Sequence, residues 1–145
     1  MAAPTKTLTA GLLASASLMT VAADDNPLAC ELGRTRPLVV VVPTANHPLL
    51  TGLQAQLRQA EMRRRFDERE MILFTVIGDQ GHREGLPLSE TQTRSMMAAL
   101  ELPANSPVMV FLVGKDGGIK LSEHNDQVSL EDVFGRIDTM PMRRR

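Results

Sequence analysis

The chain has 145 residues, of which 43% are hydrophobic and 23% charged, as expected for a single globular domain. The net charge is −1 and the chain has neither Trp nor Tyr, which argues against nucleic-acid binding through a basic, aromatic-lined surface. Its one cysteine, Cys30, excludes an internal disulfide, a dithiol redox centre and a cysteine-rich zinc site.

The N-terminal segment has the pattern of a signal peptide. Lys6 precedes an apolar stretch over residues 8–22, and Val21-Ala22-Ala23 offers small residues at a cleavage site. The stretch is too short and too rich in Ser and Thr to predict a membrane span. We therefore expect cleavage near Ala23 and an exported protein, periplasmic or secreted.

The chain after this segment divides into two parts. Residues 24–36 form a lead-in segment, and residues 37–145 form the domain. Leu38-Val39-Val40-Val41-Val42 is a continuous β-branched run, which predicts a strand buried on both faces. After the loop over residues 43–48, Asn46 or His47 is placed to cap a helix that has Pro48 in its first turn. Apolar residues then follow at helical spacing, and the far end of this one helix is charged over residues 63–70.

The middle of the chain predicts a second buried strand over residues 71–77, followed by a polar loop over residues 78–85. Ser89-Glu90-Thr91-Gln92 has the pattern of a capping box, so a helix should begin there. Pro103 requires that helix to end before it.

The last part of the chain predicts a β-hairpin and a helix. Pro107 precedes a strand over residues 108–113, and Lys115-Asp116-Gly117-Gly118 is a turn signal before a short strand over residues 119–121. Ser129 is expected to cap the final helix. The basic tail Arg143-Arg144-Arg145 is shorter than a typical binding tail.

The element order is therefore β-α-β-α-β-β-α, an α/β domain with a four-stranded mixed sheet and helices on both faces. The first two strands need a right-handed crossover and run parallel, and the last two form a hairpin. This is the minimal thioredoxin-like arrangement. Pro107 before a buried strand and the Lys-Asp-Gly-Gly hairpin also resemble the cis-proline segment of thioredoxin-like proteins.

Several segments resemble a bacterial family of unknown function, the domain-of-unknown-function family numbered 4174, also called the prokaryotic DUDES-type domain. They are Arg36-Pro37-Leu38, Phe74-Thr75-Val76-Ile77-Gly78-Asp79, residues 114–121 and residues 137–145. The resemblance implies a thioredoxin-like fold and an exported location, and it implies no known reaction. Related animal domains occur in extracellular-matrix proteins, which favours binding.

A thioredoxin-like enzyme carries its reactive cysteine in the loop after the first strand, where the helix N-terminus lowers the pKa of the thiol. The loop here, Pro43-Thr44-Ala45-Asn46-His47-Pro48, has no cysteine. Disulfide exchange and thiol peroxidase chemistry therefore lack their usual nucleophile.

The carboxyl ends of the parallel strands favour one edge of the sheet as a ligand site, with a helix start that can accept an anion. Arg83 would assist there. The alternative is that these polar side chains only cap helices and shape turns. The candidate ligand-binding residues are Thr44, Asn46, His47, Asp79, Gln80, His82, Arg83 and Pro107.

Other chemistries have weaker signals. His47 and His82, with Asp79, lack any recognised metal-ligand spacing, so neither a metal nor another cofactor is predicted. Cys30 is interpreted as a small apolar residue that packs on the sheet, the alternative being a reactive thiol. The run over residues 63–65 lies at a helix C-terminus among acidic residues, which predicts a solvated helix end.

Two functions follow from these observations. The first is a non-catalytic binding or adaptor module of the cell envelope, without a CxxC redox pair, whose partner is an unknown envelope protein or small ligand. The second is an atypical single-cysteine thiol oxidoreductase or peroxidase that uses Cys30. Neither needs nucleic acid or a membrane span.

Overall fold

The computed structural model describes residues 25–103, 107–124 and 128–141. The predicted signal segment 1–23, with its cleavage site near Ala23, and the tail Arg143-Arg144-Arg145 lie outside these ranges. None of the described helices is both long and apolar enough to cross a membrane.

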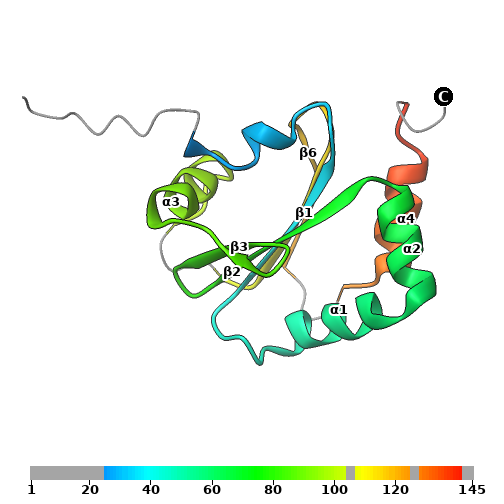
Figure 1. Ribbon diagram of the computed structural model, residues 1–145, viewed down its shortest axis with the longest axis horizontal. Coiled ribbons are helices and arrows are strands. Elements are labelled where there is room, and N and C mark those ends of the chain that lie inside the picture. The colour runs from blue at the N-terminus through cyan, green and yellow to red at the C-terminus, as the bar shows by residue number, and fades with distance from the viewer. Residues whose placement is uncertain (1–24, 104–106, 125–127, 142–145) are drawn as a thin grey trace, which may run out of the picture.

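A six-stranded mixed sheet forms the centre of the described structure (Figure 1). Its strands lie in the order β4-β3-β2-β1-β5-β6. Only β1 and β2 are parallel to each other, and every other neighbouring pair is antiparallel. The strands are β1 (Arg36–Val42), β2 (Met71–Ile77), β3 (Gln80–Arg83), β4 (Leu86–Pro87), β5 (Met109–Val113) and β6 (Ile119–Glu123).

Helices cover both faces of the sheet, as predicted. They are α1 (Pro48–Arg58), α2 (Ala60–Glu68), α3 (Glu90–Ala99) and α4 (Leu130–Asp138), with a short 3-10 helix, η2 (Ala29–Glu31), in the lead-in. Figure 1 shows α1, α2 and α4 on one side, and α3 with the lead-in on the other.

The alternation of side chains along β1 explains these two layers. Leu38, Val40 and Val42 belong to the core beneath α1, α2 and α4, whereas Val39 and Val41 belong to the core beneath α3. All five side chains are 3% exposed or less. A run of β-branched residues suits this strand because both of its faces are buried.

The prediction of a four-stranded sheet is wrong, because the polar loop over residues 78–85 contains β3 and leads into β4. Gly78 has φ +64°, and Ile77 pairs with Gln80 across a two-residue turn, Gly78-Asp79. Such a turn joins two antiparallel strands. The strand went unpredicted because its residues, Gln-Gly-His-Arg, carry no apolar alternation.

The single helix predicted after β1 is two helices. Gln59 has an extended backbone, φ −73° and ψ 124°, between α1 and α2. An unbroken helix over residues 48–68 would be about 31 Å long, whereas a seven-residue strand spans about 23 Å. The break turns the chain back toward the start of β2, and it buries Phe66 fully in the core.

Two of the three predicted helix caps have the expected form. His47 Nδ1 accepts a hydrogen bond from the backbone N–H of Leu49 at 3.2 Å, and Ser89 forms a complete capping box with Gln92. Ser129 stands at the N-terminus of α4, but its side chain makes no capping hydrogen bond. The predicted N-cap position of Ser129 is therefore confirmed, but another side chain supplies the hydrogen-bond acceptor.

Candidate functional site

The loop after β1 contains three of the predicted site residues. Their side chains form hydrogen bonds within the loop and with the start of α1. Thr44 Oγ1 donates a hydrogen bond to Asn46 Oδ1 at 2.8 Å. His47 is half-buried and accepts the N–H of Leu49 as the α1 cap. These contacts match the alternative interpretation, in which the side chains shape the turn and begin the helix.

The residues of the second predicted loop do not all lie at that edge of the sheet, because β3 runs antiparallel along β2. Asp79 and Gln80 stay at the edge and line a pocket of about 430 Å³ against α3. His82 pairs with Thr75 in the register. In the described part of the chain, no side-chain hydrogen bond or ion pair joins Asp79, Gln80 or His82 to Asn46 or His47.

Arg83 does not lie at the edge predicted for it. Arg83 pairs with Phe74 in the register, which is three strand positions, or about 10 Å, away from the edge. Its Nε donates a hydrogen bond to Glu31 Oε1 at 2.9 Å, and its Nη2 lies 2.8 Å from the same oxygen in an ion pair. Arg83 therefore ties the lead-in to the sheet and does not assist at the start of α1.

Pro107 is exposed and lies two residues before Met109, which pairs with Val41 near the end of β1. This agrees with the edge predicted for it. The peptide bond before Pro107 belongs to Ser106, outside the described residues.

Cys30 is exposed on η2, so its predicted packing on the sheet is wrong. Its neighbours take the inward positions, since Leu28 and Glu31 are 9% and 4% exposed. The backbone N–H of Gly33 donates to the carbonyl of Lys115, which places this segment beside the β5–β6 hairpin. The thiol therefore lies at the end of the sheet opposite Pro107.

The described residues contain no group of three or more His, Cys, Asp or Glu side chains arranged to hold a metal ion. The charged run on α2 is engaged in ion pairs. Arg63 pairs with Asp67 and Glu84, and Arg64 with Glu61 and Glu68. Arg65 pairs with Glu131 of α4, so this run joins elements and carries few uncompensated charges.

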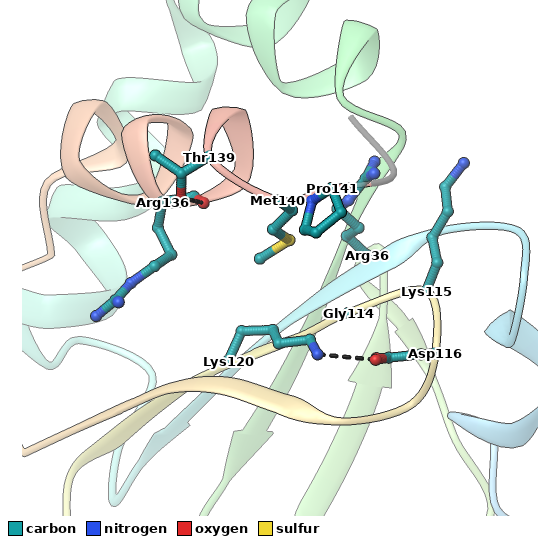
Figure 2. Close-up of a pocket in the computed structure, with 9 residues that line it drawn as sticks. All are labelled: Arg36, Gly114, Lys115, Asp116, Lys120, Arg136, Thr139, Met140 and Pro141. Atoms are coloured by element: carbon teal, nitrogen blue, oxygen red, sulfur yellow. Dashed lines mark hydrogen bonds and ion pairs between the residues drawn. The ribbon is translucent and has the colours of Figure 1, made fainter. Parts of the chain in front are cut away.

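A pocket lined by four cationic side chains lies at the opposite edge of the sheet, where β1 begins and β5 ends. We call this site the basic pocket; its volume is about 410 Å³. Figure 2 shows its walls, which come from β1, the β5–β6 hairpin and the end of α4. The lining residues are Arg36, Gly114, Lys115, Asp116, Lys120, Arg136, Thr139, Met140 and Pro141.

The turn between β5 and β6 positions the Lys120 side chain along one wall of the basic pocket. Asp116 Oδ1 accepts the N–H of Gly118 at 2.9 Å, and Asp116 Oδ2 accepts from Lys120 Nζ at 2.8 Å. A Cβ atom on Gly114 would lie 2.6 Å from Lys120 Cε, so the lysine side chain packs directly over this glycine. The hydrogen bond from Lys120, followed by the one from Gly118, lowers the pKa of Asp116. Asp116 is therefore a carboxylate at neutral pH.

The rear wall of the basic pocket contains Arg36 and Lys115. Arg36 is 3% exposed and its Nη1 donates to the carbonyl of Arg69 at 2.8 Å. Glu70 Oε2 lies 3.9 Å from Arg36 Nη1 and pairs with Lys115 Nζ. The buried guanidinium is thus held in a fixed position by the backbone.

Arg136 forms the opposite flank, on the exposed side of α4. Its backbone carbonyl accepts a hydrogen bond from Thr139 Oγ1 at 2.7 Å. Within the described part of the chain, its guanidinium has no hydrogen bond or ion pair. Of the other cations of the lining, Lys120 pairs with Asp116 and Lys115 with Glu70, and Arg36 lies 3.9 Å from the same Glu70 carboxylate.

The basic pocket has no clear signal in the sequence, because the carboxyl ends of the parallel strands point to the other edge of the sheet. Residues 115–118 predict a hairpin turn, and Arg36 ends the lead-in segment. One signal was available: the expected topology brings the start of β1 and the end of β5 to one edge. The position of α4 beside that edge was not predictable from local patterns.

Comparison with known protein families finds a match over most of the chain. Residues 27–145 match the model of a domain of unknown function, DUF4174, so the chain belongs to this family. The match includes every residue that lines the basic pocket. A search of curated proteins finds no match.

Proposed function

We propose that this member of the DUF4174 family is a non-catalytic binding module of the cell envelope, exported after cleavage near Ala23. It uses a thioredoxin-like scaffold from which the redox cysteine pair is missing. The strand order β2-β1-β5-β6, with β1 and β2 parallel and β5 antiparallel, supports the thioredoxin-like part of this proposal. The apolar stretch over residues 8–22 supports export.

The observation that carries the proposal is the chemistry of the basic pocket. Its lining provides hydrogen-bond donors and positive charge, which bind and orient a ligand. The described residues of the lining include no Cys, Ser or His, and the hydroxyl of Thr139 donates to the carbonyl of Arg136. Asp116, with its pKa lowered by Lys120, is a weak proton acceptor. A site of this composition suits recognition better than acid–base or nucleophilic catalysis.

The second candidate is a thiol oxidoreductase or peroxidase that uses Cys30, and the exposure of the thiol favours it. The position of the thiol opposes it. Cys30 lies on the lead-in, whereas His47 occupies the start of α1, where thioredoxin-like enzymes activate their cysteine.

Turnover of a model disulfide and of hydrogen peroxide by the purified protein separates these two functions. We expect no turnover above the uncatalysed rate, and no difference between the wild type and Cys30→Ser. Turnover that the Cys30→Ser substitution abolishes would refute the binding-module proposal and establish the thiol enzyme.

A further inference from the structure

We draw no further inference here: the strongest candidate, the apolar pocket of about 320 Å³ that Leu28, Leu32 and Ile119 line between the lead-in and the β5–β6 hairpin, carries no proposal because nothing in the structure shows what covers it.

Discussion

At the scale of a single residue, Gly81 of β3 packs so closely against α3 that its neighbours leave no room for a side chain. Its backbone N–H donates to Thr93 Oγ1 at 3.1 Å, and Thr93 is 2% exposed on α3. A Cβ atom on Gly81 would lie 2.6 Å from that same oxygen and 3.1 Å from Leu88 Cδ1. Glycine is therefore required here by the approach of α3 to the strand.

Gly81→Ala should destabilise the protein by about 1–3 kcal/mol, because the added methyl overpacks the β3–α3 contact. Gly52→Ala is the control, since Gly52 lies in α1 with no atom within 4 Å of an added Cβ. It should stabilise the protein by about 0.5–1 kcal/mol through helix propensity. Urea unfolding of both variants measures the difference, and similar effects at the two sites would contradict the packing argument.

At the scale of the elements, a side chain from another helix, α1, caps the N-terminus of α4. Gln56 of α1 accepts the N–H of Leu130 through Oε1 at 3.1 Å and donates from Nε2 to the carbonyl of Val128 at 2.9 Å. This side chain supplies the hydrogen-bond acceptor that a capping Ser129 would otherwise provide. It also joins α1 to α4 on the same face of the sheet.

Gln56→Ala should lower the free energy of unfolding by about 1–2 kcal/mol, because it leaves the N–H of Leu130 and the carbonyl of Val128 without these partners. Ser129→Ala should have almost no effect, since the serine side chain makes no capping hydrogen bond. Thermal unfolding of the two variants is the measurement. A larger loss for Ser129→Ala than for Gln56→Ala would mean that the serine caps the helix in solution.

At the scale of the whole molecule, the lead-in is packed as part of the domain. Leu28 belongs to the core beneath α3. Glu31, 4% exposed, accepts hydrogen bonds from Arg83 and from Thr35 Oγ1. Gly33 donates to the carbonyl of Lys115. These contacts reach β3 and the β5–β6 hairpin, which lie on opposite sides of β1 in the sheet.

Glu31→Ala should destabilise the whole domain by about 1–3 kcal/mol, because it removes charge-assisted hydrogen bonds from a buried carboxylate. The unfolding transition should remain single, since the lead-in and the sheet share one core. Glu90→Gln, on an exposed carboxylate of α3, is the matched control and should change stability little. Far-UV circular dichroism during urea unfolding reports the transition, and a separate early step for Glu31→Ala would show that the lead-in folds independently.

Local patterns in the sequence predicted much of the fold. The valine run, the capping box at Ser89, the cap at His47 and the hairpin over residues 115–118 all depend on residues a few positions apart. The interactions that form these elements therefore lie within short segments of the chain. The residues of the candidate ligand site were not all brought together by the fold. β3 places Arg83 beside Glu31, away from the start of α1, and the sequence of β3 has no apolar alternation that would predict a strand.

The sequence by itself determined that the chain has one cysteine, no CxxC pair and a central strand buried on both faces. These properties follow from composition and from the periodicity of side chains along one strand. Only the tertiary structure decided that Gln56 caps α4, that Cys30 faces solvent, and that Arg36, Lys120 and Arg136 line one pocket. These three cations lie up to a hundred positions apart in the chain, so only the packing of α4 beside the start of β1 and the hairpin brings their charges together.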